Sequence, residues 1–357
     1  MHDQGGCIYS LLKNIVFQLD AERAHRLGMS VLSALQRQAW LLHHVAKRNR
    51  VLDKRLNQTL FNVPFENPVG LAAGFDKNAE VLQAWAGLGF GFVEVGTVTP
   101  KSQPGNPKPR LFRIPEEQTI QNAMGFNNHG MRAMRERVRP QYPLHFPLGI
   151  NLGKNKSTPN EHAIDDYLTL IPELDGMCDY LVLNLSSPNT PGLRELENPK
   201  SIKSLFTQAT ELTDTPMLLK VSPDSDAAYT VDLCATAVDA GATGIIATNT
   251  SIDYTLTPKA KDFGGLSGAV IREKSFAIFD AIAEELYGKA VLISVGGIDS
   301  GNEAYRRLKA GASLVQVYSA LIYEGPALIR RINRELLDCI EMSGYDHITD
   351  AIGVNRR

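Results

Sequence analysis

One segment of the chain gathers side chains that could do chemistry. Residues 184–194 (NLSSPNTPGLR) follow the apolar run Tyr180–Leu183 and combine hydroxyls, amides and prolines. Pro188 and Pro191 fix φ and restrict the residues before them, so the loop is stiff for its length. A stiff polar loop after a buried strand is typical of the catalytic face of an α/β barrel. The same residue types also make an ordinary βα turn.

Other apolar runs of the chain also end in polar groups. A core strand needs no such groups, and burying each of them unpaired would cost about 2 kcal/mol or more. They therefore predict a polar-lined pocket at one face of a barrel. The groups are Asp76 and Lys77, Thr97, Asn151, Asn184, Lys220, and Thr248 with Asn249 and Thr250.

Glycines and a hydroxyl mark a second part of this pocket. Residues 264–268 (GGLSG), 295–297 (VGG) and the pair Tyr318-Ser319 lie late in the chain. Barrels bind phosphate through backbone N–H groups of such late loops. We therefore expect a ligand that carries a phosphate.

Lys220, at the end of the run 217–221, allows three interpretations. It could form a structural ion pair, or a Schiff base as in an aldolase. It could also be a fixed cation that stabilises the anion of a reduced, electron-rich cofactor ring. The surrounding amides and hydroxyls suit hydrogen bonds to a flavin-like ring and favour the third interpretation.

These groups need a scaffold that brings many strand ends together. About eight apolar runs alternate with helical patterns over roughly 300 residues, which predicts an α/β fold of the (β/α)₈ TIM barrel type. Residues 99–142 are too long for a simple connection and should cross the barrel mouth. The expected strands are 69–73, 92–95, 147–151, 180–184, 217–221, 244–248, 291–295 and 314–318, with a hairpin at 58–61 and 63–65. The expected helices include 77–88, 201–212, 227–240, 271–286 and 301–310.

An N-terminal two-helix extension precedes the barrel. Residues 8–19 show an amphipathic helical pattern, and Asp20 is a plausible N-cap for a second helix through about residue 46. The helices could simply cap the barrel, or could form a peripheral membrane-binding unit with a basic rim. We expect residues 1–50 to form this extension, 51–340 the barrel, and 341–357 a C-terminal tail.

The bulk composition excludes several classes of protein. The 357 residues are 43% hydrophobic and 21% charged, with a net charge of −2, so no basic field favours nucleic acid. Residues 1–56 hold nine Lys/Arg against four Asp/Glu, which suits an anionic membrane surface. The four cysteines show no metal-binding spacing, and no membrane span or signal peptide is visible.

Long and specific motifs run through the chain. They are GLAAGFDKN at 70–78, EVGTVTPKSQPGNPKPRLFR at 94–113, NAMGFNN at 122–128, NLSSPNTPGLR at 184–194, IATNT at 246–250, GGLSG at 264–268 and VGGID at 295–299. With these motifs the chain closely resembles the dihydroorotate dehydrogenases, specifically the bacterial, quinone-dependent class 2 type. The soluble class 1 enzymes have a cysteine where Ser187 stands, so Ser187 and the N-terminal extension both favour class 2.

The resemblance implies FMN as cofactor, no metal, and oxidation of dihydroorotate to orotate, the redox step of pyrimidine biosynthesis. It implies Ser187 as catalytic base and hydride transfer from C6 of the substrate to flavin N5. The implied cofactor-binding residues are Ala73, Gly74, Phe75, Asp76, Lys77, Thr97, Asn151, Asn184, Lys220, Thr248, Gly268, Gly297, Tyr318 and Ser319. The implied substrate-binding residues are Lys77, Asn122, Ala123, Met124, Gly125, Phe126, Asn184, Asn189, Asn249 and Thr250.

The resemblance also implies partners and a location. The two N-terminal helices should form an apolar tunnel through which a membrane quinone reaches the flavin. We expect a peripheral protein on the cytoplasmic side of the inner membrane, monomeric and without nucleic-acid partners. The alternatives are another FMN barrel (class 1, or a dihydrouridine synthase acting on tRNA), a Schiff-base lyase using Lys220, and a non-catalytic phosphate-ligand binding protein.

Overall fold

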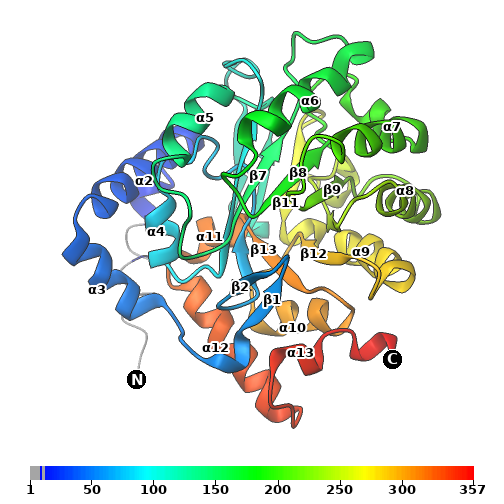
Figure 1. The fold of residues 1–357 in the computed structure, drawn as a ribbon. Coiled ribbons are helices and arrows are strands. Elements are labelled where there is room, and N and C mark those ends of the chain that lie inside the picture. Colours follow the sequence, from blue (N-terminus) through cyan, green and yellow to red (C-terminus); the bar gives the residue numbers. More distant parts are fainter. Residues whose placement is uncertain (1–8, 10–12) are drawn as a thin grey trace.

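Eight parallel strands close into a barrel with helices around it (Figure 1), which confirms the expected (β/α)₈ architecture. The computed structural model describes residue 9 and residues 13–357. Around the barrel, β13 pairs with β3 and closes the ring. The barrel strands are β3 (Val69–Leu71), β4 (Phe92–Val98), β7 (Leu148–Leu152), β8 (Tyr180–Asn184), β9 (Met217–Val221), β10 (Gly244–Ala247), β12 (Val291–Val295) and β13 (Leu314–Val317).

The barrel strands are buried on both faces because side chains fill the interior and helices cover the outside. All five residues of β8 are buried, for example. The expected bounds of β8, β9 and β12 are confirmed, and the other strands differ by a few residues. The covering helices are α4 (Leu82–Gly87), α5 (Met131–Val138), α6 (Ala163–Leu174), α7 (Pro199–Ala209), α8 (Ala227–Asp239), α9 (Arg272–Leu286), α10 (Gly301–Lys309), α11 (Ser319–Glu324) and α12 (Leu328–Met342).

A short hairpin closes the amino end of the barrel. Strands β1 (Gln58–Leu60) and β2 (Val63–Phe65) pair antiparallel, as expected. Phe65 packs edge-on against Phe92, with ring centroids 5.5 Å apart, and Phe61 lies 5.9 Å from Tyr180. The hydrophobic interior is therefore sealed at this end, and only the opposite end remains for a polar pocket.

The excursion after β4 builds a small second sheet. Strands β5 (Leu111–Ile114), β6 (Thr119–Asn122) and β11 (Gly265–Gly268) form an antiparallel sheet in the order β11-β6-β5. Residues 264–268 were expected to be a turn, but residues 265–268 form a strand because β6, far away in sequence, pairs with them.

Two expected helices differ most from the structure, whereas those expected over 201–212, 227–240, 271–286 and 301–310 differ by at most three residues at either end. The helix expected over 77–88 begins only at Leu82, because the Asp76 carboxylate accepts hydrogen bonds from the backbone N–H groups of Glu80 and Val81 and holds that segment in a turn. The second N-terminal helix is two helices, α2 (Ala21–Gln36) and α3 (Ala39–Asn49), which are separated at Arg37 and Gln38.

The beginning of α2 agrees with the sequence. The Asp20 side chain accepts hydrogen bonds from the N–H groups of Glu22 and Arg23, which confirms it as the N-cap. Of the helix expected over 8–19, residues 13–16 are helical, whereas residues 8 and 10–12 lie outside the described residues. Among the helices that the structure describes, none has the length and apolarity needed to cross a bilayer.

The C-terminal residues pack on the barrel. In α13 (Ile348–Ala351), Ile348 and Ala351 are buried, and the hydroxyl of Tyr287 donates to the carbonyl of Ile352 at 3.0 Å. Arg356 donates to the carbonyl of Ala310 at 3.1 Å. Residues 348–356 are thus tied to α9 and to the end of α10.

A buried ion pair supports the end of the barrel near β12. Arg307 of α10 is fully buried, and its Nε lies 2.6 Å from Glu303 Oε1. The same guanidinium donates to the carbonyls of Arg272 at 2.9 Å and Gly296 at 3.1 Å. Arg307 therefore joins α10, the start of α9 and the loop after β12.

Replacing Arg307 by alanine should lower the free energy of unfolding by about 3 kcal/mol, because it leaves the buried Glu303 carboxylate without its closest partner. Arg306→Ala is the matched control, since Arg306 is 37% exposed and lies closer to the exposed Glu273 (2.8 Å) than to Glu303 (3.3 Å). Its loss should change the stability by about 1 kcal/mol or less. Chemical denaturation of both variants measures this difference, and equal losses would contradict the assignment.

Candidate active site

A pocket opens where the barrel strands end, and the structure brings most of the expected residues together there. They come from β4, β6, β8, β9, β11 and the loops after the barrel strands. The expected residues that line the pocket are Ala73, Gly74, Lys77, Thr97, Asn122, Met124, Gly125, Phe126, Asn184, Ser187, Asn189, Lys220, Thr248, Asn249, Thr250, Gly268, Gly297, Tyr318 and Ser319.

Four expected residues lie behind the pocket wall. Phe75 packs between the rings of Trp85 and Tyr318, at 5.2 and 5.3 Å. Asp76 is fully buried and caps the turn before α4. Asn151 and Ala123 also lie outside the lining. Asn151 and the carbonyl of Ala123 hold pocket residues or the loops beside them by hydrogen bonds.

A buried carboxylate organises the bottom of the pocket. Glu94 Oε1 accepts from Asn151 Nδ2 at 2.8 Å and lies 3.6 Å from Lys220 Nζ, and its Oε2 accepts from Gln316 Nε2 at 2.5 Å. Asn151 Oδ1 in turn accepts from Asn184 Nδ2 at 3.0 Å. Lys220 is therefore a fixed, paired cation rather than the free amine that a Schiff base requires.

The loop that carries Ser187 is held at several points. Arg194 donates to the carbonyls of Ser186 and Thr250 and to Asp224 Oδ2, each at 2.8 Å. The Ser187 side chain is 5% exposed, and its Oγ accepts a hydrogen bond from the N–H of Asn189 at 3.3 Å. This N–H can stabilise negative charge on Oγ when the serine gives up its proton.

Amide side chains surround Ser187. Asn189 Nδ2 donates to Asn122 Oδ1 at 3.1 Å, and Asn249 Nδ2 donates to Asn184 Oδ1 at 3.2 Å. Among the described residues, Thr250 Oγ1 is buried and has no hydrogen-bond partner in the protein. This set of donors and acceptors suits a flat polar ring with amide-like edges.

A positively charged group completes this side of the pocket. Lys77 lies at the boundary between the pocket and α2. Burial and, to a smaller extent, the nearby Arg110 lower the pKa of its ammonium to about 8, while Glu22 opposes the change. Lys77 can therefore bind an anionic group of a ligand while it remains charged below about pH 8.

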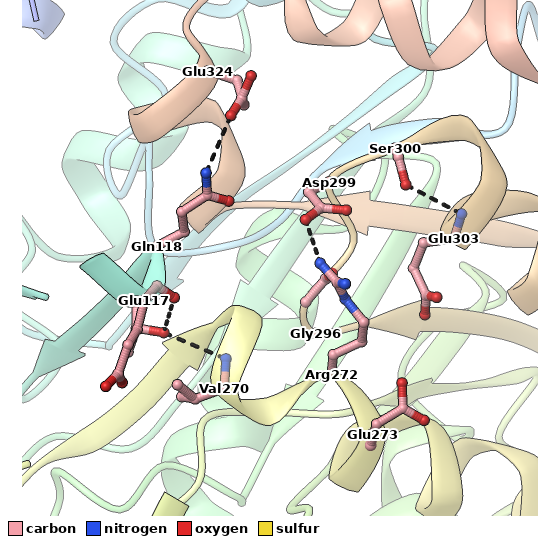
Figure 2. Close-up of polar contacts among 12 residues, drawn as sticks. Glu117, Gln118, Val270, Arg272, Glu273, Gly296, Asp299, Ser300, Glu303 and Glu324 are labelled. Carbon is pink, nitrogen blue, oxygen red and sulfur yellow. Dashed lines mark hydrogen bonds and ion pairs between the residues drawn. The ribbon is translucent and has the colours of Figure 1, made fainter. Parts of the chain in front are cut away.

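The opposite side of the pocket is built from glycines. Gly268 and Gly297 have φ of +106° and +70°, and a Cβ on Gly297 would lie 2.6 Å from the Cα of Arg272. Figure 2 shows Arg272 paired with Asp299 beside Gly296, and Gln118 directed at Glu324. The backbone here is exposed to the pocket without side chains in front of it, as a phosphate site requires.

Helix α2 reaches the pocket through aromatic contacts. The His25 ring packs edge-on against Phe75 at 5.1 Å, and Phe75 contacts Tyr318 of the pocket. Burial lowers the pKa of His25 to about 4, so this imidazole is neutral at physiological pH. A second cleft of about 600 Å³ lies between α2 and the barrel; its lining includes His25, Met29, Arg37, Lys77, Asn127 and His129.

The outer side of the N-terminal helices carries exposed apolar side chains. Val31 on α2 is 59% exposed and Trp40 on α3 is 72% exposed. Lys47 and Arg48 lie in the last turn of α3. Exposed apolar groups with basic neighbours are typical of a surface that contacts a membrane interface.

Sequence reasoning missed residues that support the pocket from a distance. Gln316 lines the pocket and binds Glu94, and a polar residue inside the apolar run 314–317 was the available signal. The contact of Glu22 with Arg110 joins residues 88 positions apart, which no local pattern indicates.

Comparisons with known proteins identify the family of this chain. The family model for dihydroorotate dehydrogenase matches residues 55–340. A dihydroorotate dehydrogenase (quinone) from Sulfurovum sp. is 57% identical over 347 residues, covering 97% of this chain and 98% of the relative. One of the same description from Nitratiruptor sp. is 54% identical over 349 residues, covering 98% and 99%.

Solved structures give the same result. The crystal structure of DHODH from Eimeria tenella in complex with ferulenol matches with a TM-score of 0.83 and 36% identity, covering 96% of this chain and 99% of that one. The ligand-free form matches with a TM-score of 0.80. With the barrel, the pocket and these relatives in agreement over nearly the whole length, the chain belongs to the dihydroorotate dehydrogenase family.

Proposed function

We propose that this chain oxidises (S)-dihydroorotate to orotate, with FMN as redox cofactor and a membrane quinone as electron acceptor. The observation that carries the proposal is the convergence of Ser187, the amides and Lys77 on one pocket with a glycine-built phosphate end. The quinone-dependent relatives support the choice of acceptor.

The pocket residues fit a flavin. The bottom offers Lys220 and Thr97, and Gln316 Oε1 is buried without a hydrogen-bond partner among the described residues. We assign the ring to Ala73, Gly74, Thr97, Asn184, Lys220 and Thr248, with Phe75, Asp76, Lys77 and Asn151 as further cofactor-binding residues, and the phosphate to Gly268, Gly297, Tyr318 and Ser319. When bound, the flavin supplies a hydride acceptor at N5.

The substrate residues have complementary roles. The ammonium of Lys77 binds the carboxylate of dihydroorotate, and the side chains of Asn122, Asn189 and Asn249 pair with the amide edges of its ring. We assign Ala123, Met124, Gly125, Phe126, Asn184 and Thr250 to the same site.

Ser187 acts as the base that removes the proton from C5 of the substrate. A serine hydroxyl is a weak base at neutral pH, so its position matters more than its intrinsic basicity. The N–H of Asn189 and the fastening of the loop by Arg194 supply that position.

The N-terminal helices bring the acceptor to the flavin. Quinone is apolar and must pass from the bilayer to a site next to the pocket, and α2 contacts both the pocket wall and solvent. We infer that residues 1–50 form this entry unit ahead of the barrel at 51–340 and the segment 341–357. A peripheral monomer at the cytoplasmic side of the inner membrane remains the prediction.

Ser187→Ala should retain FMN and bind orotate within about threefold of the wild type, but reduce its flavin about 10³-fold more slowly, because a positioned base contributes that order of rate. Anaerobic stopped-flow absorbance with dihydroorotate measures this rate. Unchanged reduction kinetics would remove Ser187 from the mechanism.

Orotate affinity should fall as the pH rises above 8, by up to about tenfold per pH unit, because Lys77 loses the charge that binds the carboxylate. Titration of the flavin spectrum with orotate between pH 6.5 and about 9.5 measures the change. The Lys77→Met variant should bind orotate weakly at every pH and should not show this fall in affinity. If the variant still showed the fall, a group other than Lys77 would be responsible for it.

Val31→Glu combined with Trp40→Glu should abolish binding to anionic lipid vesicles and slow turnover with membrane quinone, because both side chains lie on the membrane-facing side. Flavin reduction by dihydroorotate should be unchanged. Met342→Glu, at a residue on α12 that is 89% exposed, is the matched control. Co-sedimentation with vesicles measures the lipid binding of each variant. An equal loss of lipid binding in the control would refute the assigned surface.

A further inference from the structure

Helix α2 is fixed to the barrel by a buried ion pair. Glu22 and Arg110 are 8% and 6% exposed, and Arg110 Nη2 and Nε lie 2.9 and 3.2 Å from the two carboxylate oxygens. Burial works to raise the pKa of Glu22, but hydrogen bonds from Arg110 and Lys108 lower it to about 2. The carboxylate is therefore charged at every physiological pH.

The same guanidinium holds a turn of the excursion after β4. Arg110 Nη1 donates to the carbonyls of Pro104 at 2.6 Å and Asn106 at 2.8 Å. Between these residues lies Gly105, with φ of +77°, where a Cβ would come within 2.3 Å of the carbonyl oxygen of Met124. The turn is thus packed between Arg110 and the backbone of the substrate segment.

Asn106 connects this turn to two loops of the pocket. Its Nδ2 donates to the carbonyl of Ala123 at 3.1 Å and to that of Asn189 at 3.0 Å, and its N–H donates to the carbonyl of Met124 at 3.0 Å. Asn189 is the residue whose N–H binds Ser187 Oγ. A continuous chain of hydrogen bonds therefore runs from α2 to the loop that carries Ser187.

We propose that Glu22 and Arg110 are positioning residues for the dihydroorotate site: the ion pair that fixes α2 to the barrel also fixes, through Asn106, the two loops that hold the substrate. Neither residue lines the pocket, and their hydrogen bonds reach it through Asn106. This inference rests on the proposed function and extends it, because it couples the quinone-side helix to the affinity for the other substrate.

Charge provides a second signature of the pair. Lys77 faces Arg110 from the excursion and Glu22 and His25 from α2. The neighbouring Asp76 is turned toward the backbone before α4. Removing the negative charge of Glu22 leaves Arg110 uncompensated beside Lys77, which should lower the pKa of Lys77 further.

The test compares Glu22→Gln, Asn106→Ala and their double variant in the full-length holoenzyme. Orotate dissociation constants come from flavin spectral titrations at several pH values, and flavin content and thermal midpoint report folding. Each single variant should weaken orotate binding about tenfold. The double variant should bind orotate no more weakly than the weaker of the two single variants, because both substitutions break the same chain of contacts. Only the variants that lack the Glu22 charge should lower the pH at which orotate affinity begins to fall.

Lys108→Met is the matched control. Lys108 contacts Glu22 at 3.0 Å but has no hydrogen bond to the 104–106 turn among the described residues, so orotate binding should stay within about twofold. The proposal would be overturned if Glu22→Gln bound orotate with wild-type affinity. It would also be overturned if the loss of affinity in the double variant equalled the product of the two single losses. If Glu22→Gln does not accumulate as a flavoprotein, Glu22→Asp takes its place, because it draws the carboxylate away from Arg110 but keeps the charge. Its orotate affinity, alone and combined with Asn106→Ala, is judged as for Glu22→Gln, and the pH at which its affinity begins to fall should not move. A wild-type flavin that dihydroorotate fails to reduce would instead refute the proposed function.

Discussion

The buried carboxylate of Glu94 is the constraint on which the barrel and its pocket both depend. Its partners Asn151, Lys220 and Gln316 come from β7, β9 and β13, so four of the eight strands meet at one charge. An unpaired carboxylate in this interior would be prohibitive. Because side chains alternate along a strand, a shift of one residue in any of these strands would turn its polar group toward the covering helices. The pairing that selects the strand register therefore also sets the bottom of the pocket.

Much of the fold could be predicted from local pattern, and the exceptions have physical reasons. Strands β8, β9 and β12 are short, mostly apolar runs, and their bounds agree with the sequence prediction. Helix α4 starts late because the side chain of Asp76 binds backbone that the helical pattern would have used. The strand β11 forms only because β6 lies beside it, and the break between α2 and α3 has neither glycine nor proline to mark it.

The candidate site, like the fold, could be predicted in large part from local sequence motifs. Residues within the sequence motifs largely line one pocket, because the ends of parallel strands meet at one face. Phe75, Asp76 and Asn151 lie one layer behind, where they hold the lining residues in place. The sequence could not indicate Gln316 as the partner of Glu94, or Arg110 as the partner of Glu22, since tertiary packing alone joins residues so far apart.

The second cleft, between α2 and the barrel, has a consequence for inhibitors. Its lining includes Glu22, His25 and Lys77, so it borders both the helix that we propose faces the quinone and the cation that we propose binds dihydroorotate. A compound that wedges α2 away from the barrel would disturb both half-reactions at once. Such a compound should show mixed inhibition with respect to each of the two substrates, unlike a molecule that only occupies the quinone path. Resistance by changes at the quinone path alone would be correspondingly harder to acquire.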